Sequence, residues 1–321
     1  MLLIKGLDQN IEDMIMLHLN SKDIRIIGKD YISDYVWPRK KDENIHEAIE
    51  NGNIIGLQYL IKQRNLDLRA ADDYIFRIST ELGQLELTEW LVDQGGADIH
   101  ADNDYALRLS ARNGHLNIVR YLIKLGANVR ADNDYALLYS AENGHLDIVM
   151  CLHEHGADIR ADNDYALFIS AENGQANVVE YLLDNGANIH AYKNEIVYCS
   201  ARNGHLNIVK CLVERSTNTS TNTSTKTSTK TVKNKTVNIS IALCCGAKYG
   251  HLDIVKYLIE HYVDIINTTN VINEALRLSI KQGHSDIVKY LTDKRDEIKL
   301  IDALSLIDLS TSLPRIGSTS L

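Results

Sequence analysis

The sequence lacks several features that would assign it to a common class of protein. No apolar run approaches the roughly 18 residues that a membrane-spanning helix needs. Residues 1–4 are apolar, but Lys5 follows at once, which leaves no apolar core for a secretory signal. The net charge of -9 disfavours nonspecific binding to nucleic-acid phosphates, which requires an excess of Lys and Arg. We therefore expect an intracellular, cytoplasmic protein that is not secreted and binds neither membrane nor nucleic acid.

Motifs for catalysis and metal binding are missing as well. The chain contains no phosphate-binding loop, no nucleophile elbow and no HExxH motif. Its five cysteines are an odd number and include no CxxC pair. A zinc or redox site near Cys199 and Cys245 is the alternative, but we expect five reduced, mostly packed thiols. The sequence thus predicts a protein without enzymatic activity, metal or cofactor.

What the chain does contain is an internal repeat. Three consecutive units of thirty residues begin at Ala97, Ala127 and Ala157, and each includes the string ADNDYAL. A repeat of this length indicates a solenoid, in which each unit buries its apolar face against its neighbours. Such a fold has no single internal pocket, so binding on an extended surface is the default function.

Each unit is expected to form two helices separated by a glycine turn. In the first unit, Asp104 is predicted to be the N-cap of a short helix that ends at Gly114. The spacing of Ile118, Val119 and Leu122 then predicts a second helix with one buried stripe. The acidic residues of each DND string are interpreted as turn and cap residues, not as cation ligands.

These units resemble the ankyrin repeat. Residues 106–111 (ALRLSA) stand where that repeat has PLHxAA, and residues 114–123 (GHLNIVRYLI) stand where it has GHxxIVxxLL. The units are shorter than the usual ~33 residues. The short DNDYAL unit also resembles the ankyrin proteins of giant DNA viruses of amoebae. The resemblance implies an all-α, helix-turn-helix solenoid with shortened fingers and about eight repeats, which binds proteins.

Sliding the same template along the chain predicts its organisation. Repeats 1–6 are expected at residues 43–215 and repeats 7–8 at residues 239–294. Residues 216–238 are rich in Ser, Thr, Asn and Lys, and we expect a disordered insertion there because almost nothing in it is apolar. Residues 1–42 are expected to cap the array without matching a known module, and residues 295–321 to form a cap helix and a frayed tail.

The histidines of the array occupy one template position. They directly follow a glycine at His115, His145, His205, His251 and His284. Since a catalytic group would have to appear once, this recurrence predicts a structural role in the turn between the two helices.

The ankyrin resemblance implies that fingers and inner helices line the binding groove. We therefore expect partner-binding residues where the first helices of similar repeats differ. The candidates are Arg108, Arg112, Leu138, Tyr139, Glu142, Phe168, Ile169, Glu172, Tyr198 and Arg202. Aromatic residues and Arg dominate binding hot spots. For Leu138 and Phe168, packing between repeats is an equal alternative.

Together these features predict a monomeric, non-enzymatic scaffold that binds a protein partner, a host protein if the viral resemblance reflects its origin. Two alternatives stay open. The chain could recruit substrates to a ubiquitin ligase, or it could be a structural paralogue without a specific partner. An enzyme located in residues 1–41 is disfavoured, because about 40 residues rarely form a stable core alone.

Overall fold

The computed structural model describes residues 49–50, 52–64, 70–192, 194–218, 229–262 and 268–297. Throughout these ranges every regular element is an α-helix, which confirms the predicted all-α class. The chain divides into two compact units, Met1–Ala131 and Asp132–Leu321, and each is described by itself. The predictions for residues 1–42 and for the tail at 298–321 lie outside the described residues.

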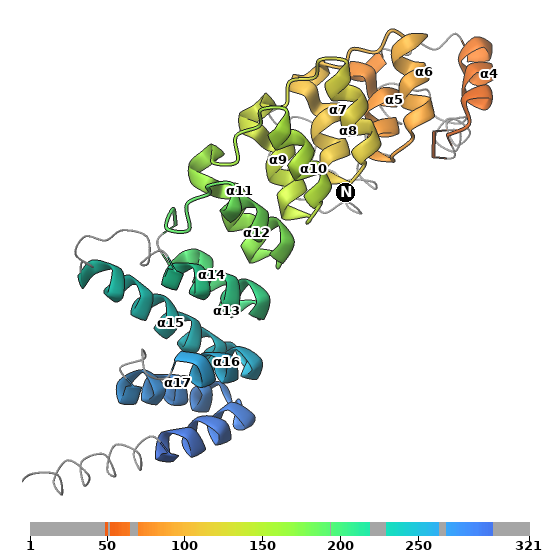
Figure 1. The fold of residues 1–321 in the computed structure, drawn as a ribbon. Coiled ribbons are helices and arrows are strands. Elements are labelled where there is room, and N and C mark those ends of the chain that lie inside the picture. Colours follow the sequence, from red (N-terminus) through yellow and green to blue (C-terminus); the bar gives the residue numbers. More distant parts are fainter. Residues whose placement is uncertain are drawn as a thin grey trace, which may run out of the picture. The chain divides into compact units, whose positions relative to one another are not determined.

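The first unit consists of successive helix pairs. Its helices are α4 (Ile54–Arg64), α5 (Ala70–Glu81), α6 (Leu85–Asp93), α7 (Ala101–Arg112) and α8 (Leu116–Lys124). Helix α5 packs against α7, and α6 packs against α8 (Figure 1). The predicted apolar stripe of α8 lies in the core of this stack. At most 1% of the surface of Ile118, Val119 and Leu122 is exposed.

The second unit continues the pattern. Its helices are α9 (Ala131–Glu142), α10 (Leu146–Glu154), α11 (Ala161–Glu172), α12 (Ala176–Asp184), α13 (Glu195–Arg202), α14 (Leu206–Asn218), α15 (Thr229–Tyr249), α16 (Leu252–Tyr262) and α17 (Thr268–Gln282), followed by a helix at residues 285–297. We call the first helix of each pair the inner helix and the second the outer helix. Inner helices α11, α13, α15 and α17 pack in succession, as do outer helices α10, α12, α14 and α16 (Figure 1).

The histidine position has the structural role that the sequence predicts. The Nε2 atom of His205 lies 3.0 Å from the carbonyl oxygen of Glu172, at the end of the inner helix of the preceding repeat. His115, His251 and His284 make the same contact with the preceding repeat at 2.8–3.0 Å. The ring therefore joins neighbouring repeats within each unit.

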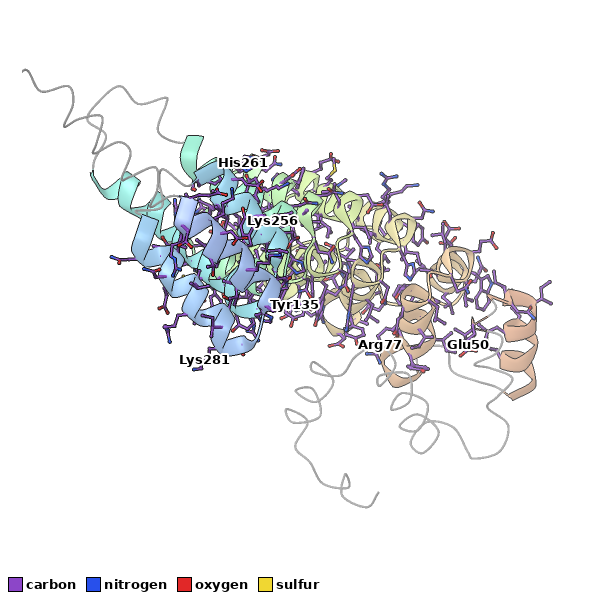
Figure 2. The ribbon with its side chains drawn as sticks, turned by 90° about the horizontal axis from the view of Figure 1, so that it is seen from below. Glu50, Arg77, Tyr135, Lys256, His261 and Lys281 are labelled. Carbon is purple, nitrogen blue, oxygen red and sulfur yellow. The ribbon has the colours of Figure 1, made fainter. Side chains whose placement is uncertain are left out.

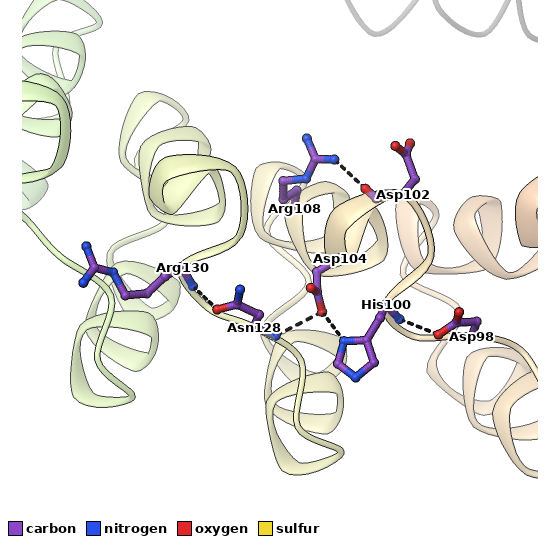
Figure 3. Close-up of polar contacts among 7 residues, drawn as sticks. All are labelled: Asp98, His100, Asp102, Asp104, Arg108, Asn128 and Arg130. Atoms are coloured by element: carbon purple, nitrogen blue, oxygen red, sulfur yellow. Dashed lines mark hydrogen bonds and ion pairs between the residues drawn. The ribbon is translucent and has the colours of Figure 1, made fainter.

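The predicted N-cap role is wrong for Asp104. Residues 102–104 all have left-handed backbone angles, with φ between 51 and 57°, and the contacts of the Asp104 carboxylate include no N–H group of its own helix. Instead its buried carboxylate accepts a hydrogen bond from the Asn128 backbone N–H at 3.0 Å, in the finger of the following repeat (Figure 3). The His100 ring lies 3.0 Å from the same oxygen.

The second unit repeats this link. Asp134 accepts from the backbone N–H of Asp158, and Asp164 accepts from that of Asn188, both at 2.8 Å. The left-handed turn that precedes each inner helix aims the carboxylate at the next finger, and Asp and Asn tolerate this conformation better than other side chains do. The Asp carboxylate thus links neighbouring repeats by a hydrogen bond, whereas the sequence predicted that it would act within its own repeat.

The expected insertion at residues 216–238 is helical at both of its ends. Helix α14 runs to Asn218 and α15 begins at Thr229. Ser216 is buried, and its hydroxyl donates to the Val213 carbonyl at 2.7 Å. Burial of Ile239 and Leu243 anchors α15, and an existing helix extends at little cost because each added residue gains a hydrogen bond. Residues 219–228, the middle of the segment, lie outside the described part.

Candidate partner-binding surface

Two of the candidate residues, Arg108 and Arg112, lie on α7 in the first unit. Arg108 donates a hydrogen bond of 2.8 Å to the carbonyl oxygen of Asp102 (Figure 3), and its guanidinium lies 5.1 Å from the centre of the Tyr105 ring. Arg77 of α5 approaches the same ring at 5.3 Å. Burial raises the pKa of Tyr105, and the two guanidinium groups oppose that shift. The two arginines and the tyrosine therefore form one half-buried cluster, while Arg112 lies half-buried in the last turn of α7.

The other eight candidates lie in the second unit, where α9 carries three of them. Leu138 is buried, with 7% of its surface exposed, so it has little area to offer a partner. Tyr139 and Glu142 are half-buried on the same helix. The Tyr139 ring meets the Tyr135 ring edge-on, with a distance of 4.3 Å between the ring centres. Of the two apolar candidates here, Tyr139 is the one available at the surface.

On α11, Phe168 belongs to an aromatic cluster. Its ring stacks on Tyr165, with centres 5.9 Å apart, and lies 4.9 Å from the ring of Tyr192. Tyr192 precedes α13, and its hydroxyl donates to the Asp162 carbonyl at 3.2 Å. Phe168 and the neighbouring Ile169 are both half-buried. The cluster therefore presents aromatic surface that spans two consecutive repeats.

Sequence reasoning missed Tyr192, although the sequence contained a signal for it. The string AYKNEIV replaces ADNDYAL in this repeat, and Tyr192 occupies the place of the first Asp of the string. An aromatic residue in place of a turn aspartate marks a departure from the structural consensus. The same departure removes the left-handed turn, since Asn194 has a φ of -108° and α13 begins only at Glu195.

A second cluster surrounds Tyr198 and Arg202 of α13. Tyr198 is 37% exposed, and its hydroxyl lies 3.2 Å from that of Tyr249 on α15. The Arg202 guanidinium lies 5.7 Å, and the Lys248 ammonium 4.9 Å, from the centre of the Tyr249 ring. Tyr249 was also missed, and its signal was the replacement of the Asn that precedes the turn glycine in most other repeats. Aromatic rings and cations thus meet at the junction of two inner helices.

The side chains of Tyr198, Tyr249 and Lys248 shift one another's pKa values. The hydrogen bond with Tyr198, reinforced by the bond with Lys248, lowers the pKa of Tyr249 below its ordinary value. The same bond raises the pKa of Tyr198. The bond with Tyr249 also raises the pKa of Lys248, so the ammonium group stays charged.

In Glu142 and Glu172 the backbone and the side chain have separate roles. Their carbonyl oxygens accept from the next repeat, Glu142 from the Gln175 side chain at 3.1 Å and Glu172 from Asn203 at 2.9 Å. Their carboxylates occupy the same half-buried position at the ends of α9 and α11. The backbone of these residues is therefore structural, while the side chain is free to differ from repeat to repeat.

The cysteines form no disulfide, and Cys151, Cys199 and Cys245 are buried. Burial raises the pKa of Cys199 and of Cys245 to about 11. These thiols are protonated at neutral pH, and the thiol is the unreactive form. Among the residues that the structure describes, no three His, Cys, Asp or Glu side chains gather closely enough to hold a metal ion. No described helix has the length and apolar character to cross a bilayer.

Comparison with known proteins agrees with the repeat geometry. The family profile described as ankyrin repeats (3 copies) matches in five overlapping stretches, namely residues 45–133, 75–163, 129–193, 160–225 and 198–302. No curated protein matches the chain. The profile covers well over half of the sequence, and its matches coincide with the helix pairs joined by glycine turns and interhelical histidines. The chain therefore belongs to the ankyrin-repeat family.

Proposed function

We propose that this protein is a non-enzymatic scaffold that binds a protein partner along the inner helices of its second unit. Ankyrin repeats generally mediate protein–protein interaction, which supports the class of function. The observation that carries the proposal is the partial exposure of large apolar side chains at positions where the repeats differ. Tyr139, Phe168, Ile169 and Tyr198 all leave part of their surface open.

These residues contrast with the core of the same helices. Leu137 and Leu167 occupy one template position in consecutive repeats, are identical and are fully buried. The next position holds Leu138 and then Phe168, and the one after it Tyr139 and then Ile169. Constant residues thus build the stack, and variable residues supply exposed area of the kind found in hot spots.

The test is a comparison of variants by affinity capture. Tyr139→Ala combined with Ile169→Ala is expected to abolish capture of the main partner, because truncating a hot-spot residue costs about 2 kcal/mol or more. The matched control is Met150→Ala combined with Glu180→Ala, two exposed residues on the outer helices of the same repeats. Circular dichroism must show that both variants keep the helical content of the wild type.

The source of the partner follows from the resemblance of the DNDYAL units to proteins of giant amoebal viruses. We propose a host protein, so the capture uses an amoebal lysate. A protein lost with the inner-helix variant and kept with the control supports the proposal. Equal capture by both variants would place binding elsewhere. Recovery of ubiquitin-ligase subunits would favour the adaptor role, and no specific protein from any lysate would favour a structural paralogue.

A further inference from the structure

The last three inner helices carry a cation where the preceding two carry an acid. The position in question is Glu142 on α9 and Glu172 on α11, but Arg202 on α13, Lys248 on α15 and Lys281 on α17. We call Arg202, Lys248 and Lys281 the basic row. Positive charge is thus concentrated in one part of a chain whose net charge is -9.

The three cations of the basic row lie near one another, at the same end of adjacent helices. Helix α13 packs against α15, and α15 packs against α17, so the row crosses three neighbouring helices. Packed helix axes are about 8–10 Å apart, which sets the approximate spacing of the row. Arg202 and Lys281 are exposed and Lys248 is half-exposed; Figure 2 shows Lys281 at the surface.

Within the described residues, no carboxylate forms an ion pair with a cation of the basic row. The ion pairs of this region involve other cations, namely Arg215 with Asp184 and Arg277 with Glu274. Arg202 and Lys248 instead lie over the Tyr249 ring, an arrangement that leaves their charge available to an anion. The exposed part of Tyr198 adds aromatic surface beside them. The row therefore combines three cations with the aromatic contacts that favour a peptide over a free anion.

We infer that the basic row, together with Tyr198 and Tyr249, binds an acidic segment of a protein partner. A segment in the polyproline II conformation has three residues per turn and advances about 3.1 Å per residue, so carboxylates three residues apart lie on one face about 9 Å apart. That spacing matches neighbouring helices, and one Asp or Glu in every three residues places a carboxylate at each cation. This inference rests on the proposed scaffold function and specifies the chemistry of its partner.

The probe is a fluorescently labelled twelve-residue peptide with Glu at every third position, titrated into the full chain at low salt. The matched peptide carries Gln in place of Glu. Only the Glu peptide is expected to bind, and raising the salt from about 50 mM to about 500 mM should weaken it, because exposed charges are screened. A single-stranded oligonucleotide of similar charge is the third probe, and tighter binding of that probe would overturn the inference.

The variant set separates this site from general charge. Arg202→Glu, Lys248→Glu and Lys281→Glu together should weaken the Glu peptide by at least about tenfold, since three attractive pairs become repulsive. The control is Lys210→Glu, Lys256→Glu and Lys289→Glu, which changes the charge equally on the outer helices of the same repeats. Figure 2 shows that Lys256 lies apart from Lys281 on the surface. The control is expected to change binding by less than about twofold.

Two results contradict the inference. One is equal loss of binding in both triple variants, and the other is equal binding of the Glu and Gln peptides. If charge reversal disturbs the circular dichroism spectrum, the three residues are changed to Gln, and the same comparison applies. Failure of the peptide leaves the scaffold function standing if capture still depends on Tyr139 and Ile169. If capture does not depend on Tyr139 and Ile169 but the Glu peptide still binds at the basic row, the proposed scaffold surface fails and the inference about the basic row stands.

Discussion

Replacing Gly144 with alanine tests how successive repeats are held together. Gly144 forms the turn between α9 and α10 with a φ of +79°. A Cβ atom added there would lie 2.6 Å from Cδ of Gln175, the side chain that reaches over the turn from the next repeat. Gln175 must then move, and its hydrogen bond to the Glu142 carbonyl, 3.1 Å long, is lost. The substitution therefore strains the turn and breaks a link between repeats.

The magnitude follows from these two effects. A left-handed conformation costs a residue with a Cβ about 1–2 kcal/mol, and a lost hydrogen bond costs about 0.5–1.5 kcal/mol. Gly144→Ala should therefore lower the free energy of unfolding by about 1.5–3.5 kcal/mol. The control is Gly156→Ala, since Gly156 has a φ of +97° but no atom within 4 Å of the added Cβ. It carries the strain alone and should cost about 1–2 kcal/mol.

Urea denaturation followed by circular dichroism measures both variants. The double variant Gly144→Ala with Gln175→Ala separates the two effects. Gln175→Ala should cost less in the Gly144→Ala protein than in the wild type, because the Gln175 hydrogen bond is already lost there. Neighbouring residues that share a contact show such coupling. If Gly144→Ala costs no more than Gly156→Ala, or if Gln175→Ala is additive, the proposed link between the repeats is refuted.

Four further predictions follow from the same contacts and surfaces. Asp134→Ala should lower stability by about 1.5–3 kcal/mol, because the Asp158 N–H loses a charged acceptor, and Asp134→Asn should lose less because it keeps an acceptor; urea melts check both. Burial raises the pKa of Cys199 and Cys245 from 9.0 to about 11, so these thiols keep their protons in the native state at a pH where unfolded thiols lose theirs. Stability should therefore fall as pH rises from 9 to 11, and Cys245→Ala should flatten that profile in urea melts at each pH. Partner capture should depend on Tyr139 and Ile169 but not on Met150 and Glu180. Binding of the Glu peptide should depend on the basic row and fall with salt.

The helix pairs were predictable because local signals determine them. The apolar spacing of Ile118, Val119 and Leu122 and the recurrent glycine each report on a single repeat, and both are confirmed. The recurrence of the histidines indicated a structural role but not its partner, since the acceptor carbonyl lies in another repeat. Periodicity therefore showed that a contact exists without showing what it joins.

The role of Asp104 shows why the remainder was not predictable. An Asp before a helix is normally a cap, and although Asp and Asn tolerate left-handed angles, the DND string alone does not show that residues 102–104 adopt them. The link to Asn128 depends on that backbone turn and on the position of the next finger. The candidate surface had a similar limit. Leu138 and Tyr139 are adjacent, and both have large apolar side chains. Only the packing of the helices decides that Leu138 is buried while Tyr139 is partly exposed.

The contacts between repeats and the candidate binding residues use different parts of the chain. The links are made by Asp carboxylates to finger N–H groups, and by His or Gln side chains to the carbonyls of residues such as Glu172 and Arg202. Because these acceptors are backbone atoms, the side chains at the same positions can change sign from Glu to Arg or Lys without losing a link. The surface of the inner helices can thus vary in charge while the stack is preserved. This separation is the reason to expect that charge reversal along the basic row alters binding without unfolding the protein.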